Sequence, residues 1–390
     1  MKDFTFNIPT KIYFGKDNLD KLPEEIKKYG KKVLLVYGKN SIKKIGLYDE
    51  IVELFKKNDI KYWEVSGVVP NPRIDKVRKG VEIVKKEKID FILAVGGGST
   101  IDTAKLIAVA SPIEEDPWDI VIRKVTPKKG LPIGTILTLS ATGSETNTSS
   151  VITNEETGQK LGWASEYAMP KFSFMNPEYT TFVNSYHTAA GTSDIMSHTM
   201  ENYFSLNDGA YLQDRMAEAI LKTCIYYGPI AMKDPDNYEA RANLMWAGTW
   251  AINGLLDSGK DTAWSVHPME HELSAKRDIT HGVGLAILTP YWLEYSLSEK
   301  TEEKIADFGY NVFDIEKGNS KREDAEEAIK ALREFFISLG IPKRLRDVDF
   351  KEDELRDMAK NCVENRIKPE INGFIHLEEE DVYQIYKMAF

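Results

Sequence analysis

The chain has 390 residues, of which 42% are hydrophobic and 29% charged, and its formal net charge is −10. These proportions are those of a soluble globular protein, and the length exceeds one typical core, so we expect two domains. The acidic balance argues against a nucleic-acid-binding surface. The two cysteines, Cys224 and Cys362, are too few for a disulfide framework and form no CxxC pair, which fits a reducing compartment.

The N-terminal segment MKDFTFNIPTKIYFG alternates apolar and polar residues, a pattern typical of a β-strand. It lacks the apolar centre of a signal peptide, and no apolar stretch reaches the roughly 18 residues that span a bilayer. We therefore expect a cytoplasmic protein without a membrane anchor.

The first half of the sequence alternates continuous apolar runs with amphipathic helical patterns. Strands that are rich in Val, Ile and Leu along their whole length are buried on both faces, so the alternation indicates a parallel sheet covered by helices on either side. A β-hairpin follows this region. The predicted strands are 32–36, 61–65, 91–95, 131–137 and the hairpin arms 149–153 and 160–164, and the predicted helices are 47–57, 75–86 and a segment ending at 110.

From about residue 187 helical periodicity dominates to the end of the chain. The fold class is therefore predicted as a doubly wound, Rossmann-like α/β domain with a β-hairpin, followed by an all-α domain. No repeat or low-complexity linker marks the join, so the boundary is placed at the change of pattern, giving domains 1–185 and 186–390. The long helical segments are predicted at 189–205, 210–226, 238–256 and 322–338.

Three consecutive glycines follow a predicted buried strand and precede a helical pattern. Gly96, Gly97 and Gly98 lack a Cβ, so the backbone can approach a ligand closely, and Ser99 opens a helix whose N-terminus attracts an anion such as a pyrophosphate. On its own the loop is a weak signal that a tight turn also explains, since its spacing is neither GxGxxG nor that of a P-loop, but its position after a buried strand favours phosphate binding. Asp102, in the first turn of the helix, either contacts the ligand or orients the loop.

A second polar loop, LTLSATGSETN at 137–147, follows the next predicted strand. Its hydroxyl groups lie at the carboxyl end of the sheet, where loops of doubly wound folds converge on the ligand. Loops rich in Ser and Thr are also common as simple turns. This segment therefore indicates a ligand site only in combination with the glycine loop.

Four of the six histidines lie between residues 198 and 281, and three of them combine with an aspartate into a pattern typical of a mononuclear metal site. Asp194 and His198 are four residues apart in a helical pattern, so both side chains project from one face. His267 and His281 complete the set. One carboxylate and three imidazoles suit Fe, Zn, Co, Ni or Mn as the divalent ion. An isolated histidine is more often a satisfied polar residue, and the clustering is what favours the metal site.

Together these segments resemble the iron-containing, or group III, alcohol dehydrogenase family, and within it the branch of butanol dehydrogenases and broad-range aldehyde reductases. The resemblance covers nearly the whole chain. It implies a dinucleotide-binding α/β domain and an all-helical metal-binding domain, an active site between them, and a homodimer. It also implies that Asp194, His198, His267 and His281 bind the metal, with Fe(II) favoured over Zn(II). The segments that carry it are PTKIYFG, VYGKNSIKKIGLYDE, PNP at 70–72, AVGGGSTIDTAK, TLSATGSETN and the metal set.

The resemblance further implies a nicotinamide dinucleotide as cofactor. Family members selective for NAD often carry an acidic residue where this chain has Lys39. A lysine cannot accept a hydrogen bond from the ribose 2′-hydroxyl but can pair with a 2′-phosphate, so NADP(H) is predicted over NAD(H), against the alternative of a solvated surface lysine. The positions assigned to the cofactor are Gly38, Lys39, Ser41, Asn71, Gly97, Gly98, Ser99, Asp102, Thr138, Thr142, Asn147, Lys160 and Tyr179.

The implied reaction is hydride transfer between the nicotinamide and a small aliphatic primary alcohol, such as butanol, or its aldehyde, with the metal as Lewis acid. His271 is the candidate catalytic residue, relaying a proton between alcohol and solvent, unless it only packs beside the ligands. Trp163, Leu256 and Trp264 either line the substrate pocket or belong to the core.

The competing functions are a polyol dehydrogenase, a dehydroquinate synthase-like lyase, a metal-dependent hydrolase and a non-catalytic binding module. The lyases normally use a glutamate in the ligand set, which argues against that alternative here.

Overall fold

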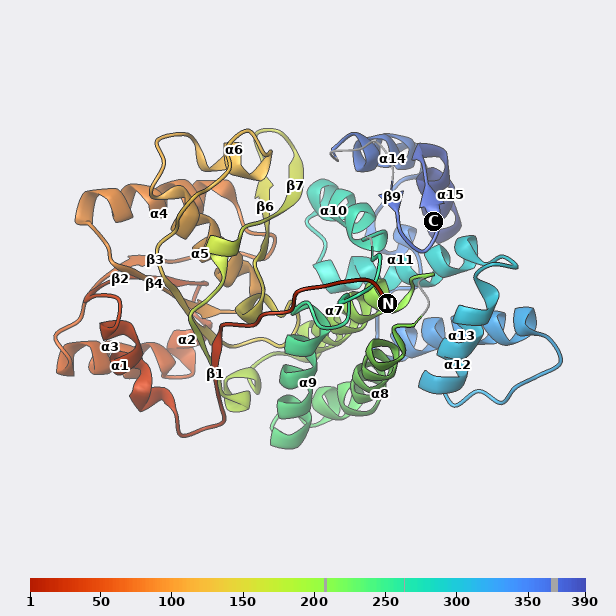
Figure 1. Cartoon of the computed structure of the whole chain (residues 1–390), viewed down its shortest axis with the longest axis horizontal. Helices are drawn as coiled ribbons and strands as arrows, with labels where there is room; N and C mark the ends of the chain where they lie inside the picture. The colour runs from red at the N-terminus through yellow and green to blue at the C-terminus, as the bar shows by residue number, and fades with distance from the viewer. Residues whose placement is uncertain (207–208, 263, 366–370) are drawn as a thin grey trace. The chain divides into compact units, whose positions relative to one another are not determined.

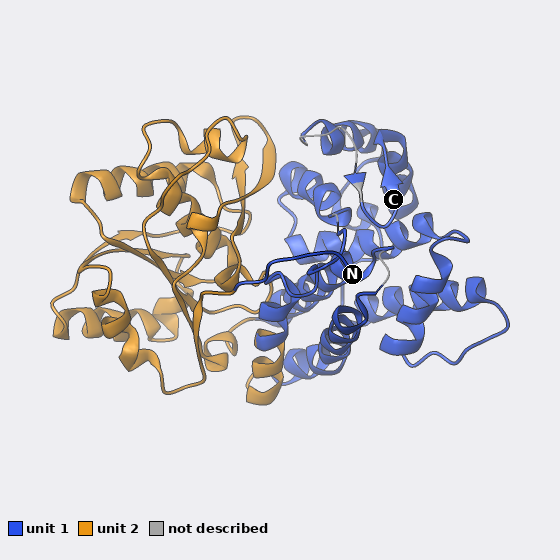
Figure 2. Ribbon diagram, in the orientation of Figure 1, with its two compact units in different colours: residues 1–7, 184–234, 246–390 blue, residues 8–183, 235–245 orange. Residues whose placement is uncertain are grey.

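The computed structural model describes residues 1–206, 209–262, 264–365 and 371–390, and the chain forms two compact units (Figures 1 and 2). The α/β unit comprises Ile8–Val183 and Pro235–Met245. The helical unit comprises Met1–Asn7, Asn184–Asp234 and Trp246–Phe390. Each unit therefore contains a short segment from the other half of the sequence, an exchange that the sequence pattern does not indicate.

The α/β unit is built on a six-stranded parallel sheet in the order β1-β8-β5-β4-β2-β3. Every residue of β4 and β5 is buried, because these central strands are covered on both faces. This explains their continuous apolar sequence. The strands of the sheet are β1 (Lys11–Phe14), β2 (Lys32–Tyr37), β3 (Lys61–Val65), β4 (Phe91–Gly96), β5 (Ile133–Leu137) and β8 (Phe172–Met175).

Successive residues of β2 point into two different cores, as the alternation of a strand requires. Val33 and Leu35 belong to the core that contains α1 and α3, whereas Leu34 and Val36 belong to the core that contains α4 and α5. The sheet is thus covered on both faces, which confirms the predicted doubly wound class. Its helices are α1 (Leu22–Lys27), α2 (Ser41–Lys44), α3 (Leu47–Lys57), α4 (Ile74–Glu87), α5 (Gly98–Ala110) and α6 (Pro117–Val121), with 3₁₀ turns η1 (Leu19–Lys21), η2 (Ser144–Thr146), η3 (Glu166–Ala168) and η4 (Pro177–Thr180).

The predicted hairpin is confirmed as the antiparallel pair β6 (Ser149–Asn154) and β7 (Gln159–Ala164). The N-terminal strand prediction is confirmed only over β1, which pairs with the sheet, because residues 1–10 form no strand. The alternating pattern of residues 1–10 lacks a partner strand, and the backbone of Lys2 instead donates to the carbonyl of Gly259 in the helical unit. β1 lies at the edge of the sheet, and β8 is its one neighbouring strand among the described residues.

The helical unit places two long helices, α7 and α11, in its interior. All residues of α7 from Thr188 to Tyr203 are buried, and α11 is buried from Gly282 to Leu293. A Cβ atom added at Gly282 would lie 1.9 Å from the carbonyl oxygen of Ala190, so the absence of a side chain allows the two helices to touch. α7 begins one turn before the predicted start, at Ser185, where the Asn184 side chain accepts a hydrogen bond from the backbone of His187.

The remaining helices surround this pair, and α9 is divided between the units after Met245. Among the described residues of this half, a ladder of two-residue strands, β9 (Ile371–Asn372) and β10 (His376–Leu377), is the exception to the helical content. None of the helices in the described ranges combines the length and apolar composition that a membrane crossing requires. The helices are α7 (Ser185–Tyr203), α8 (Tyr211–Lys233), α9 (Tyr238–Ala251), α10 (Val266–Arg277), α11 (His281–Ser296), α12 (Glu302–Val312), α13 (Lys321–Ser338), α14 (Leu355–Glu364) and α15 (Glu379–Ala389), with η5 (Leu345–Val348) and η6 (Glu352–Glu354).

Candidate metal centre and cofactor loops

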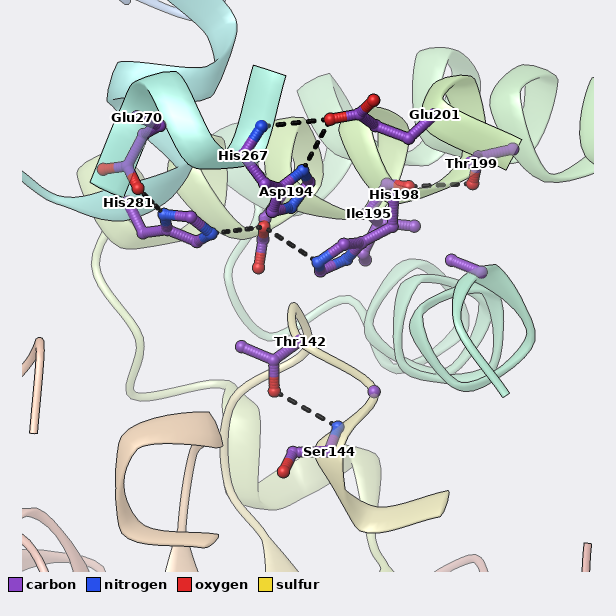
Figure 3. Close-up of polar contacts among 12 residues, drawn as sticks. Thr142, Ser144, Asp194, Ile195, His198, Thr199, Glu201, His267, Glu270 and His281 are labelled. Atoms are coloured by element: carbon purple, nitrogen blue, oxygen red, sulfur yellow. Dashed lines mark hydrogen bonds and ion pairs between the residues drawn. The ribbon is translucent and has the colours of Figure 1, made fainter. Parts of the chain in front are cut away.

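Three helices of the helical unit bring the predicted metal ligands together (Figure 3). α7 supplies Asp194 and His198, both buried, with His198 Nε2 at 3.6 Å from Asp194 Oδ1. His267 lies in the first turn of α10, and His281 is the first residue of α11, with its Nε2 at 3.8 Å from the same Asp194 oxygen. Asp194, His267 and His281 each offer a ligand atom, and these atoms lie within 4.8 Å of one another.

His198 completes the cluster through its ring contacts. Its imidazole stacks on that of His267 with centroids 4.8 Å apart. Burial first, and then the positive charge that His267 and His281 can carry, lower the pKa of His198 well below the ordinary value. His198 is therefore neutral at neutral pH, the state in which an imidazole binds a metal ion.

The donor set fits a divalent metal ion. His267 Nε2 is buried and has no hydrogen-bond partner among the described residues, although an imidazole nitrogen in that position normally has one. Its other ring nitrogen, Nδ1, lies 3.0 Å from a carboxylate oxygen of Glu201. A proton on Nδ1 leaves the lone pair of Nε2 for a metal ion.

Two buried glutamates that the sequence analysis missed hold the ligand rings. Glu201 accepts hydrogen bonds from the backbone N–H groups of Ser265, Val266 and His267 at 2.8, 2.8 and 3.0 Å, so it also caps the start of α10. Glu270 contacts Nδ1 of His281. The available signal was helical spacing, since Glu201 follows His198 by three residues and shares its helix face.

His271 lies beside one of the predicted ligands, His281. Its ring centroid is 5.7 Å from that of His281, and it forms a second group of ligand-type side chains with Glu270 and His281. Of the substrate-pocket candidates, Trp264 lies nearest the ligands, with its ring 4.6 Å from that of His267. Trp163 belongs to the core of the α/β unit, and Leu256 is buried.

In the α/β unit, the loops that carry most of the predicted cofactor residues emerge from one edge of the sheet. Strand pairing aligns Tyr37 with Val95 and Gly96 with Leu137, so the loops after β2, β4 and β5 start side by side. Lys39 and Ser41, after β2, are exposed, whereas Asn71, with φ of +51°, is buried. Tyr179 follows β8 in η4, and Lys160 is buried on hairpin strand β7.

The glycine loop and the second polar loop touch each other. α5 begins at Gly98, one residue earlier than predicted, with Gly97 as its N-cap, so Ser99 already lies within the helix. A Cβ atom at Gly98 would lie 2.4 Å from the side chain of Thr142, so only glycine permits this approach. The backbone of Thr138 donates to the carbonyl of Gly96 at 3.1 Å.

The contacts of Asp102 support the orienting interpretation of this residue. Its carboxylate accepts hydrogen bonds from the Ser144 hydroxyl at 2.7 Å and from the backbone N–H of Val151 at 2.8 Å. Thr142 in turn accepts from the backbone of Ser144 (Figure 3). Asp102 thus ties the second loop and the hairpin to α5.

Comparisons with known proteins agree with this arrangement. Residues 9–177 match the family model described as iron-containing alcohol dehydrogenase, and residues 188–390 match the model of the C-terminal region of the same family. NADH-dependent butanol dehydrogenase A of Clostridium acetobutylicum is 54% identical over 390 residues, which is the full length of both chains. NADPH-dependent aldehyde reductase YqhD of Escherichia coli is 38% identical over 94% of each chain.

Solved structures show the same fold. The crystal structure of NADH-dependent butanol dehydrogenase A from Thermotoga maritima aligns with a TM-score of 0.96 and 39% identity, covering 100% of this chain and 99% of the other. The two family models together cover both units. The chain therefore belongs to the iron-containing alcohol dehydrogenase family and is an NAD(P)-dependent oxidoreductase of the alcohol dehydrogenase class.

Proposed function

We propose that the protein interconverts small aliphatic primary alcohols and aldehydes at a divalent metal held by Asp194, His198, His267 and His281. The convergence of one buried carboxylate and three imidazoles from three helices carries this proposal. The names of the Clostridium and Escherichia relatives support the substrate class. Family membership does not favour the lyase or hydrolase alternatives.

In this reaction a bound divalent ion supplies Lewis acidity toward the substrate oxygen, and a nicotinamide donates or accepts the hydride. Asp194 provides the one anionic ligand, and His198 stays neutral because it is buried. Glu201 and Glu270 hold the proton of their imidazole partners on Nδ1, so that Nε2 is presented as the ligand atom.

His271 is proposed to move the proton between the substrate hydroxyl and solvent. It is half-buried beside His281, and an imidazole exchanges protons near neutral pH. We also propose Fe(II) as the favoured ion, because four protein ligands leave room for a substrate oxygen only when the ion accepts at least five ligands, and Zn(II) prefers four.

A coupled spectrophotometric assay tests the function. Oxidation of NADPH is followed at 340 nm with butyraldehyde, using metal-free protein and protein reconstituted with Fe(II) or Zn(II). We expect consumption of NADPH only when both aldehyde and metal are present. Turnover of an ester or amide without any dinucleotide, together with no NADPH oxidation, would refute the proposal.

For the cofactor we propose a preference for NADP(H), on the basis of Lys39. Its side chain is exposed directly after Gly38, where it is available to a 2′-phosphate. The relatives differ in this respect, since the Clostridium enzyme is named for NADH and the Escherichia enzyme for NADPH.

Comparing kcat/KM for NADPH and NADH tests this preference. Lys39→Asp should raise the KM for NADPH and lower the KM for NADH. Lys44→Asp is the matched control, because Lys44 is an exposed lysine on α2 that undergoes the same change of charge. A higher kcat/KM for NADH in the wild type would overturn the preference.

We further propose that the chain forms a homodimer, to which the edge strand β1 contributes. Among the described strands β1 lies at one edge of the sheet, and an edge strand can pair with a second copy. Sedimentation of the wild type, and of a variant in which Ile12 is replaced by proline, tests this proposal. A wild type that sediments as a monomer contradicts it.

A further inference from the structure

Lys105 is a fully buried lysine on α5, two turns after the glycine loop. Its ammonium donates hydrogen bonds to Oδ1 of Asn147 at 2.9 Å and to the backbone carbonyl of Ser149 at 2.8 Å. Burying an ammonium group is costly unless it is paired, and an apolar side chain of the same size would fill the space at lower cost. The lysine therefore requires an explanation beyond packing.

The hydrogen bonds of Lys105 fix one side of the loop 142–149. Asn147 connects three parts of this loop, because its Oδ1 accepts from Lys105 and from the backbone of Ser149, at 2.9 Å each, while its Nδ2 donates to the carbonyl of Gly143 at 3.1 Å. Gly143 itself has a φ of +59°, a conformation that favours glycine. The loop is thus closed on itself around Asn147 and anchored through Lys105.

Asp102 fixes the other side of the same loop. It precedes Lys105 by three residues, so the two side chains project from one face of α5, and it binds Ser144 and Val151. The N-terminus of α5 is the glycine loop, in which Gly98 touches Thr142. One helix therefore positions both loops, and it does so with a buried pair of opposite charges.

We propose that Lys105 is a positioning residue for the dinucleotide, because it holds the loop 142–149 against the glycine loop in the conformation that binds the cofactor. The inference rests on the proposed function, since it takes Thr142 and Asn147 as cofactor contacts. It predicts that loss of Lys105 weakens cofactor binding more than it changes the turnover of bound substrate.

The protonation of Lys105 gives this role a pH dependence. Burial lowers the pKa of Lys105 to about 8, against the opposing effects of Asp102 on α5 and Glu145 in the loop. Below pH 8 the charged ammonium makes both hydrogen bonds at full strength. Above pH 8 it loses its proton and the anchoring weakens, so the Kd of the dinucleotide rises, by at most about tenfold per pH unit.

Binding of NADPH, followed by nicotinamide fluorescence between pH 6 and 9.5 without substrate, tests the inference. The variants are Lys105→Met, Ser144→Ala, which removes a contact of Asp102 but keeps the lysine, and Lys86→Met. The last is the matched control, because Lys86 is an exposed lysine of α4 in the same unit. Thermal unfolding is measured for each variant.

At pH 7 we expect Lys105→Met to bind NADPH about 10- to 100-fold more weakly than the wild type, the effect of losing charged hydrogen bonds. Its Kd should not change between pH 7 and 9. Ser144→Ala should bind more weakly but keep the rise in Kd above pH 8, and Lys86→Met should match the wild type.

Wild-type affinity in a folded Lys105→Met protein would overturn the inference. If that variant does not fold, a wild-type Kd that stays constant up to pH 9.5 would overturn it as well. Failure of the wild type to bind NADPH or NADH at any pH would instead refute the proposed function.

Discussion

Replacing Glu201 with glutamine should weaken metal binding without unfolding the protein. The change preserves the size of the side chain but removes the negative charge 3.0 Å from Nδ1 of His267. It also turns one terminal oxygen into an NH₂ group. When the remaining amide oxygen accepts hydrogen bonds from Val266 and His267, the NH₂ group faces the backbone N–H of Ser265. Both groups are donors, so no hydrogen bond forms between them.

The size of the effect follows from these contacts. Removing a partner that orients a metal-bound imidazole typically costs about 10- to 100-fold in metal affinity. This corresponds to about 1.4 to 2.7 kcal/mol. The unpaired N–H group of Ser265, buried at the start of α10, destabilises the fold by a further 1 to 3 kcal/mol or so. A typical domain has about 5 to 15 kcal/mol of stability, so the variant remains folded.

Competition with a chromophoric chelator measures the Kd of Zn(II) or Fe(II) for metal-free protein, and urea unfolding of the same protein measures stability. Glu272→Gln is the matched control. Glu272 is also a buried glutamate of α10, but it accepts a hydrogen bond from Asn365 instead of contacting a ligand. The control should bind metal as the wild type does. A folded Glu201→Gln protein with wild-type metal affinity would refute the role assigned to this carboxylate.

Other substitutions separate the remaining roles. Asp194→Ala should abolish both bound metal, measured by elemental analysis, and reduction of butyraldehyde; metal retained at the wild-type ratio would contradict its assignment as a ligand. His271→Ala should lower kcat while metal content stays unchanged, whereas equal loss of metal would show that it supports the ligands. Burial raises the pKa of Glu272 from 4.5 to about 7, so the native state keeps a proton that the unfolded chain releases. The contribution of Glu272 to stability should therefore fall by up to about 3 kcal/mol between pH 4.5 and 7, which urea unfolding measures as a rise in the stability of Glu272→Gln relative to the wild type over this range.

The central strands and their helices were predictable because their buried positions carry apolar residues in a regular pattern. β4, for example, extends only one residue beyond its predicted end. β8 was not predicted, because a strand of four residues between β5 and β1 depends on partners that are distant in sequence. α10 also escaped prediction, since buried positions of this helix carry His267, Glu270 and Ser274 instead of apolar residues.

In the site, the scarcity of histidine allowed the ligand cluster to be predicted from the sequence. The residues that orient the ligands could not be predicted in this way. The chain contains 61 acidic residues, and helical spacing alone, which relates Glu201 to His198, does not distinguish Glu201 or Glu270 from the solvated ones. Their role depends on burial and on which backbone groups they meet, and both are properties of the folded chain. The role of Lys105 was not predicted for the same reason. It is one of 51 basic residues, and the sequence does not indicate that it is buried.

The contact between Gly282 and Ala190 limits how far the metal centre can be redesigned. Gly282 directly follows the ligand His281, and an added methyl group would stand 1.9 Å from a backbone oxygen of α7, where ordinary contact needs at least 3.4 Å. Accommodating it would shift α11 by several times the tolerance of about 0.2 Å that metal–ligand distances allow. Substitutions of the ligands that aim to change the metal must therefore keep Gly282, although this residue has no side chain to bind the ion. Gly282 sets the spacing between the helices that bear His281 and Asp194.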